Sequence, residues 1–270
     1  MGRPESVMSS FFRTYLLPGL VFQSVIIGGG YGPGREIAEF FLSRFNDDGA
    51  ATDRAGHSDL YYTVFALEGL IALQRDCPPH VQRFLESVGN GEGLDLVHLC
   101  CLARCWAALK QPAPDLAGRI DALWDRDSVY HSFLAWGALQ DLGREPTPFP
   151  IRDGSLATTT PTTAAAVTLL RQMQSPVPQD AVSYLLARAH PEGGFLATQG
   201  APMPDLLSTA TALHALAGQQ VSVAHLKDKT LDFLDTLWTG TAFCGNWADD
   251  EPDCEYTYYA LLAMGHLSLA

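Results

Sequence analysis

The same short phrase of residues occurs three times in the sequence. Side chains with carboxyl and hydroxyl groups stand at the same positions in each copy, and one copy also has a thiol. The second residue of the phrase is an aspartate each time, at Asp59, Asp205 and Asp253, and a threonine follows four residues later. In the third copy Cys254 and Tyr256 stand beside the aspartate. Carboxylate and thiolate groups can bind zinc when a further ligand converges on the same point, and a buried carboxylic acid can donate a proton.

Each copy of the phrase has the pattern of a helix start. A serine or proline precedes the aspartate, which supplies a cap or a first-turn residue, and the carboxylate favours the positive end of the helix dipole. The residues that follow are apolar on almost every face, with small residues between the large ones. Such a helix is buried on most sides. We therefore expect each phrase to begin an inner helix of the fold.

The whole chain from residue 35 follows this plan of an outer polar helix, a glycine-rich loop and an inner apolar helix. Inner helices are expected to start near residues 58, 94, 127, 161, 204 and 252. A spacing of this size is typical of stacked helical hairpins. Inner helices that are apolar all round favour a closed ring over an open solenoid, because a solenoid leaves one helix layer with a wet face.

Outer helices are expected over residues 35–45, 78–88, 114–124, 178–189 and 223–238. The fourth outer element is weak, because Arg144–Pro150 carries three prolines. A proline removes a backbone donor and breaks a helix interior, so this stretch can hold a turn or two at most.

Residues 1–34 form a separate, apolar and glycine-rich segment. No charged residue lies between Arg13 and Arg35, but Pro18 and three consecutive glycines interrupt a stretch that is short against the ~20 residues of a spanning helix. The stretch from about Phe12 to Leu42, which includes the glycine string Ile27–Ile37, resembles the first, glycine-broken helix of a family of polytopic bacterial membrane proteins in the amino-acid transporter superfamily. Three interpretations stay open: an arm packed on the domain, a fused sequence, and a membrane anchor through residues 12–31.

The charge balance excludes one class of partner. The chain has 17 lysines and arginines against 30 aspartates and glutamates, a net charge of -13, which argues against a nucleic-acid partner. Its six cysteines form no CxxC pair, and Cys100, Cys101 and Cys105 fall on one predicted helix as small core residues. A reducing compartment, the cytoplasm, is therefore expected, with membrane association as the alternative.

Two glycine-aromatic turns, each followed by a helix start, carry a resemblance to a known family. Gly193–Phe195 precedes Pro204–Leu213, and Phe243–Trp247 precedes Pro252–Tyr259. Over residues 35–270 the chain resembles the repeat of protein prenyltransferase β subunits and squalene cyclases. The resemblance implies an all-α fold, an α/α toroid of six helical hairpins, whose inner barrel holds an apolar, aromatic-lined pocket suited to an isoprenoid chain.

The resemblance also implies where a catalytic zinc would bind. In protein prenyltransferases an Asp-x-Cys pattern at one inner helix and a Tyr-His-Thr pattern at the next supply the three ligands. Here Leu207 stands in place of the cysteine and Tyr256 in place of the histidine, so only Asp205 is kept. We expect no metal, although Cys254 could approach Asp205 from the neighbouring helix and form a weak site.

The cyclase branch of the family uses an Asp-x-Asp-Asp acid, and a diphosphate needs a basic cluster. The nearest acidic string, Ala248–Asp253, lacks this spacing and falls in a loop, where it is equally well read as a solvated turn. No group of basic residues accompanies the inner-helix starts. Classical prenyl transfer is therefore not expected, and enzymatic activity is left open.

We interpret the chain as a prenyltransferase-like or terpene-cyclase-like toroid whose central pocket binds an isoprenoid or another hydrophobic small molecule. The alternatives are a non-catalytic module that binds a protein partner, with or without a membrane anchor, and a transporter fragment. The first turns of the inner helices should meet at one rim and bind the ligand there. The expected rim residues are Asp59, Tyr62, His98, His131, Asp205, Asp253, Cys254 and Tyr256. Each aspartate can equally be a helix cap, and His131 a satisfied core histidine.

Purified protein is expected to contain no stoichiometric zinc. The loss of a thiolate and an imidazole from three ligands should cost far more affinity than changes behind the ligands, which typically cost about 10 to 100-fold. Elemental analysis checks this expectation. One zinc per chain, lost on Asp205→Ala, would show that it is wrong.

Overall fold

The computed structural model describes residues 33–151, residue 156 and residues 158–270. Residues 1–32 of the predicted N-terminal segment lie outside the described residues, and with them the expected membrane anchor over residues 12–31. Among the residues that are described, none of the helices combines the length and the apolar character needed to cross a membrane.

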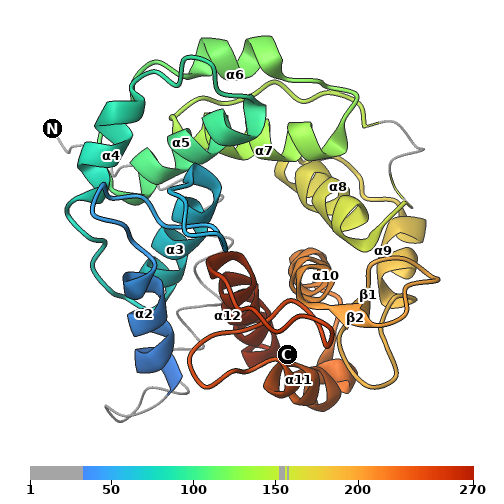
Figure 1. Cartoon of the computed structure of the whole chain (residues 1–270). Coiled ribbons are helices and arrows are strands. Elements are labelled where there is room, and N and C mark those ends of the chain that lie inside the picture. The colour runs from blue at the N-terminus through green and yellow to red at the C-terminus, as the bar shows by residue number, and fades with distance from the viewer. Residues whose placement is uncertain (1–32, 152–155, 157) are drawn as a thin grey trace, which may run out of the picture.

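Six inner helices stand side by side in a ring (Figure 1). They are α3 (Leu60–Ala72), α5 (Leu96–Ala108), α7 (Val129–Asp141), α8 (Thr160–Gln172), α10 (Leu206–Gly218) and α12 (Cys254–Ser268). Each packs against the next, and α12 packs against α3, so the ring is closed. The predicted α/α toroid is confirmed. Five of the helices begin two residues after the predicted start, because the predicted bounds included the capping residue and the residue before it.

Outer helices cover the ring from outside (Figure 1). They are α2 (Pro33–Ser43), α4 (Val81–Val88), α6 (Ala117–Leu123), α9 (Gln179–Leu186) and α11 (Lys227–Thr236), the last preceded by the 3₁₀ turn η2 (Ala224–Leu226). Between α7 and α8 the described residues form no helix, as the three prolines predict. Phe149 of this segment instead packs against Trp124 and Trp136, with ring centroids 5.3 and 6.4 Å apart, and covers part of the ring's outer face.

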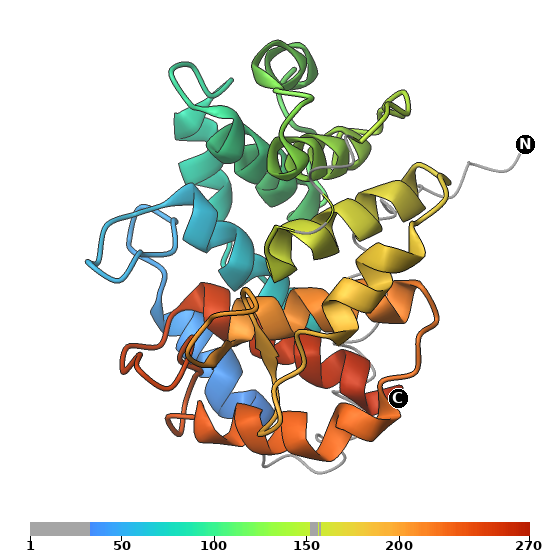
Figure 2. The ribbon, with the colours of Figure 1, turned by 90° about the vertical axis from the view of Figure 1, so that its right-hand side faces the viewer.

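The loops before α3, α10 and α12 lie at one face of the ring, and the C-terminal end of the chain lies at the opposite face (Figure 2). The loop before α10 contains the only strands in the described part of the chain, β1 (Phe195–Leu196) and β2 (Pro204–Asp205), which pair antiparallel. All inner helices therefore start at the same rim.

The repeated threonine fastens each of these three loops to the helix that follows it. All three threonines are fully buried, and their hydroxyl oxygens accept hydrogen bonds from backbone N–H groups of the preceding loop. The pairs are Ala51 with Thr63 at 2.8 Å, Phe195 with Thr209 at 2.9 Å, and Phe243 with Thr257 at 3.2 Å. A buried backbone donor needs such a partner, so the threonine of the sequence repeat sets the path of the loop.

Glycines let the same loops lie against the next outer helix. Gly49 and Gly193 adopt φ of +104° and +102°, which other residues rarely adopt. A Cβ at Gly193 would overlap the carbonyl oxygen of Lys229 in α11, and one at Gly49 would overlap that of His80 at the start of α4. Successive hairpins are thus packed closely enough for the ring to close.

Arg54 joins the first hairpin to the last across the seam of the ring. Its two terminal nitrogens donate to both carboxylate oxygens of Asp249, at 2.9 and 2.8 Å, and its Nε donates to Asp253 at 2.8 Å. Beneath this ion pair Phe65 of α3 packs against Tyr258 and Tyr259 of α12, with ring centroids 5.6 and 5.5 Å apart. The seam has both a polar and an aromatic contact.

Arg54→Ala is expected to lower the free energy of unfolding by roughly 1–3 kcal/mol, because it leaves the nearly buried carboxylate of Asp253 without its cation. The matched control is Arg35→Ala, whose partner Glu39 is exposed on the same helix, and this variant should unfold like the wild type. Urea denaturation of the three proteins checks the expectation. Equal stability of both variants would show that the Arg54 contacts do not stabilise the seam.

Candidate functional site

The six inner helices enclose a cavity of about 290 Å³ on the axis of the ring, and every one of them contributes side chains to its wall. Because the helices start at one rim, residues at equal distance from the N-cap lie at equal depth. The lining residues fall two, five or six, and nine positions after the caps, except Thr162, which comes three positions after its cap Thr159. The cavity therefore has three levels, which we call the mouth, the waist and the floor.

The mouth is formed by the residue two positions after each N-cap. These residues are Tyr61, Val97, Tyr130, Pro161, Leu207 and Glu255. Five of the six are apolar or aromatic, and Glu255 is the acidic exception. The mouth thus presents one carboxyl group in an otherwise apolar ring.

The waist has an aromatic side and a side of small residues. Phe65 of α3 and both Tyr258 and Tyr259 of α12 form the aromatic side, and Ala164 and Ala165 of α8 form part of the other. Short side chains on α8 leave room that the large rings across the axis do not fill. The free space of the cavity therefore owes much to the composition of α8.

The floor carries buried polar groups. Arg104 of α5 forms an ion pair with Glu68 of α3, and the charge of Asp141 also raises the pKa of the guanidinium against the effect of burial. His214 of α10 lies with its Nδ1 3.0 Å from Nε2 of His266. Burial lowers the pKa of both imidazoles, that of His266 to about 4, so both are neutral at pH 7.

Glu255 is the group of the mouth whose charge changes near neutral pH. Its Oε1 accepts a hydrogen bond from the hydroxyl of Tyr61 at 2.7 Å. Burial raises the pKa of Glu255 to about 7, more than the Tyr61 hydrogen bond and Arg54 lower it, and Asp253 adds to the rise. A carboxyl group that is partly protonated at pH 7 can both donate and accept a proton.

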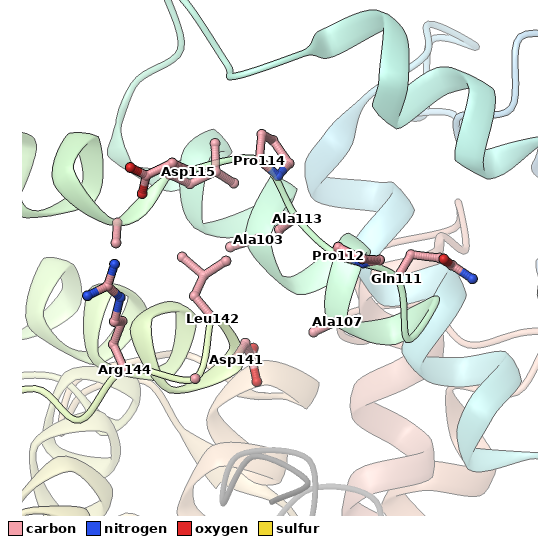
Figure 3. A pocket seen from close by; sticks show the side chains of 13 residues that line it. Ala103, Ala107, Gln111, Pro112, Ala113, Pro114, Asp115, Asp141, Leu142 and Arg144 are labelled. Atoms are coloured by element: carbon pink, nitrogen blue, oxygen red, sulfur yellow. The ribbon is translucent and has the colours of Figure 1, made fainter. Parts of the chain in front are cut away.

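A second hollow, of about 550 Å³, lies outside the ring (Figure 3). It lies between the C-terminal parts of α5 and α7 and the loop before α6, and Figure 3 shows Arg144 and Asp115 on opposite sides of it. This hollow is larger than the central cavity but more open to solvent, and loop residues form much of its wall. An enclosed cavity removes more of a small ligand from water, so the central cavity is the candidate site.

The predicted aspartates are helix caps in the structure. Asp59 accepts hydrogen bonds from the backbone of Tyr61 and Tyr62, Asp205 from that of Ser208, and Asp253 from that of Tyr256. The aspartates stand at the outer rim and do not line the cavity. The capping interpretation therefore describes what they do in the fold, and a role in ligand binding stays a prediction.

The other predicted residues lie around the rim without entering the cavity. Tyr62, His98, His131 and Tyr256 come three positions after their caps, and none of them lines the cavity. His98 contacts two aspartates: its Nδ1 lies 2.8 Å from Asp95 and its Nε2 3.9 Å from Asp59. Arg54 lies over the ring of Tyr256, 5.5 Å from its centroid. The backbone N–H of His131 donates a hydrogen bond to the hydroxyl oxygen of Ser128, the N-cap of α7.

Cys254 is fully buried as the first residue of α12, and burial raises the pKa of its thiol to about 12. In the part of the chain that the structure describes, no group of three or more histidines, cysteines, aspartates and glutamates is placed to hold a metal ion. The expected absence of zinc stays a prediction for elemental analysis.

Sequence reasoning missed the cavity residues by one position. Tyr61, Tyr130 and Glu255 each precede a residue that was predicted for the rim, and on these three helices the residue two positions after the cap lines the cavity while the next one does not. One available signal was a charged side chain inside an otherwise apolar helix. Glu68 and Arg104 are such residues, and both stand at the level of the floor.

The comparisons with known proteins agree with this architecture. The family model of the prenyltransferase alpha-alpha toroid domain matches residues 33–142 and again residues 139–269. The chain belongs to this family. The match begins after the N-terminal segment, whose resemblance to a membrane transporter gains no support. No curated protein sequence matches the chain.

Two solved structures resemble the toroid, both of the type II terpene cyclase MstE from Scytonema. The apo form is 12% identical, with 100% of this chain and 90% of that chain covered and a TM-score of 0.40. A variant in complex with its product, merosterolic acid A, is 13% identical, with 94% and 86% covered and a TM-score of 0.39.

The buried carboxyl group of Glu255 should make stability depend on pH. Because its pKa in the folded state is raised above the unfolded value near 4.5, its contribution is full below that value and is lost as the pH rises through about 7. Between pH 4.5 and pH 8 the loss amounts to roughly 2–3 kcal/mol. Glu255→Gln removes this dependence.

The measurement is the difference in free energy of unfolding between the wild type and Glu255→Gln, at pH 5 and at pH 8. We expect the free energy of unfolding of the wild type, relative to that of the variant, to be higher at pH 5 than at pH 8. Glu92→Gln, at an exposed glutamate, is the matched control and should track the wild type at both values. A difference that does not change with pH would contradict the raised pKa.

Proposed function

We propose that the chain binds a hydrophobic small molecule in the central cavity. The observation that carries the proposal is a partly enclosed cavity on the ring axis, walled by all six inner helices with mostly apolar and aromatic side chains. Ligand sites are concave, largely apolar and furnished with a few polar groups, and this cavity has that composition.

The volume of the cavity limits the size of the ligand. A dry cavity of about 150 Å³ holds benzene, so each carbon atom needs roughly 25 Å³. A cavity of about 290 Å³ then holds roughly 12 carbon atoms. A ten-carbon isoprenoid chain fits, whereas chains of fifteen and twenty carbons exceed this volume.

The charges around the cavity argue against a diphosphate head group. Of the described lining residues Arg104 is the one with a permanent positive charge, and its ion pair with Glu68 neutralises it. Above the mouth Arg54 is engaged by Asp249 and Asp253. A diphosphate binds through several basic side chains or free backbone donors. The proposed ligand is therefore an isoprenoid or similar chain without a diphosphate.

Binding should depend on chain length. In a series of geraniol, farnesol and geranylgeraniol, titrated against a fluorescent apolar dye, geraniol is expected to displace the dye and geranylgeraniol to bind about tenfold more weakly or not at all. A chain that is too long must leave apolar atoms in water or strain the wall. Equal affinity along the series would contradict the volume argument.

Ala165→Phe should weaken geraniol binding about tenfold or more, because it fills the space beside α8 with a phenyl ring. The same substitution at exposed Ala122 of α6 is the matched control and should leave binding unchanged. If the wild type binds no alcohol of the series and no dye, the proposal is wrong. The alternative, a module that binds a protein partner, would then take its place.

A further inference from the structure

The aromatic side of the cavity contains a carboxyl group. Tyr61, Phe65, Tyr258 and Tyr259 form one cluster, in which Phe65 lies with its ring centroid 4.9 to 5.6 Å from the other three. The Tyr61 hydroxyl holds Glu255 at the edge of this cluster. Aromatic faces attract cations through their quadrupoles, and they do so most strongly where water is excluded. A carboxylate held beside a cluster of aromatic rings is suited to bind an ammonium group.

The charges near the floor balance. Two carboxylates, those of Glu68 and Asp141, act on the guanidinium of Arg104, and Arg171 is a second cation, which acts on His214. His214 stays neutral because burial and the neighbouring His266 and Arg171 lower its pKa. The charges near the floor therefore do not repel a cation.

Near the mouth, acidic groups outnumber basic ones. Arg54 forms ion pairs with two carboxylates, the bidentate Asp249 and the nearly buried Asp253, and Glu255 adds a third acidic group. The chain as a whole carries a net charge of -13. Coulomb attraction at the mouth of a low-dielectric cavity thus favours a cation and opposes an anion.

We infer that the natural ligand of this cavity is a hydrophobic amine, a tertiary or quaternary ammonium on an apolar chain of about ten carbons, with its nitrogen between Glu255 and the rings of α3 and α12. The inference rests on the proposed function and adds the charge and orientation of the ligand. The apolar chain extends along the small residues of α8.

Binding of a cation then releases a proton. Below pH 7 much of Glu255 is protonated, and the ammonium stabilises the carboxylate, so the bound state has a lower pKa and a proton leaves to solvent. Affinity for the cation should rise with pH from about 5.5 to 7.5.

The groups that face Glu255 do not share this titration. Tyr61 and Tyr62 of α3 and Tyr130 of α7 have pKa values raised by burial and stay neutral, and Arg54 of the neighbouring loop stays charged. Burial also raises the pKa of Asp253, at the start of the same helix. A comparison of the wild type with Glu255→Gln therefore isolates the contribution of Glu255.

Three probes with one ten-carbon chain test the inference by calorimetry on the full chain: geranyltrimethylammonium, geraniol and geranate. At pH 7.5 the ammonium is expected to bind about tenfold tighter than geraniol, and geranate to bind most weakly. At pH 5.5 the affinity for the ammonium should fall about tenfold, while that for geraniol stays constant.

Glu255→Gln should weaken the ammonium about tenfold relative to geraniol at pH 7.5 and flatten its pH profile. Glu251→Gln, an exposed change of equal charge in the neighbouring loop, is the matched control. Tyr61→Phe supplies an independent check, because loss of its hydrogen bond should move the midpoint of the profile to higher pH. Geraniol that binds as tightly as the ammonium would overturn the inference and leave the proposed function standing. Failure of all three probes would overturn both.

Discussion

The contact between α3 and α12 is the constraint on which the rest of the molecule depends. Inner helices that are apolar on almost every face need a neighbouring inner helix on both sides. The first and last inner helices, α3 and α12, each have one such neighbour along the chain and complete the set by packing against each other. Closure brings together Tyr61 and Glu255, which are 194 residues apart in sequence. The seam of the ring therefore forms the aromatic side of the candidate site.

Much of the fold could be predicted because each of its elements has a local cause. An aspartate at the cap, a threonine four residues later and an apolar run together specify a buried helix with a fastened loop, and the sequence writes this combination at Asp59, Asp205 and Asp253. The prolines of residues 144–150 likewise predict the missing outer helix. Local signals of this kind do not depend on knowing the neighbours.

The lining of the cavity could not be predicted in the same way, because it depends on how each helix is rotated about its axis. Helices that are apolar all round have no polar face to reveal that rotation. Their low amphipathicity left the choice between Tyr61 and Tyr62, or between Glu255 and Tyr256, undecided by pattern alone. The pairing of Glu68 with Arg104 needs one more fact, that α3 and α5 are neighbours in the ring and start at the same rim.

The depth of a residue in the ring decides whether it lines the cavity. The resemblance to protein prenyltransferases implies a thiolate ligand at the position of Leu207, and this position belongs to the mouth of the cavity. The leucine forms part of the apolar wall there, and the carboxylate of the nearby cap Asp205 accepts hydrogen bonds from Ser208. The histidine that the resemblance implies would stand at Tyr256, which does not line the cavity, whereas the preceding residue, Glu255, does. The mouth of this chain thus combines an apolar wall with one titratable carboxyl group, while the caps and threonines outside the cavity build the ring.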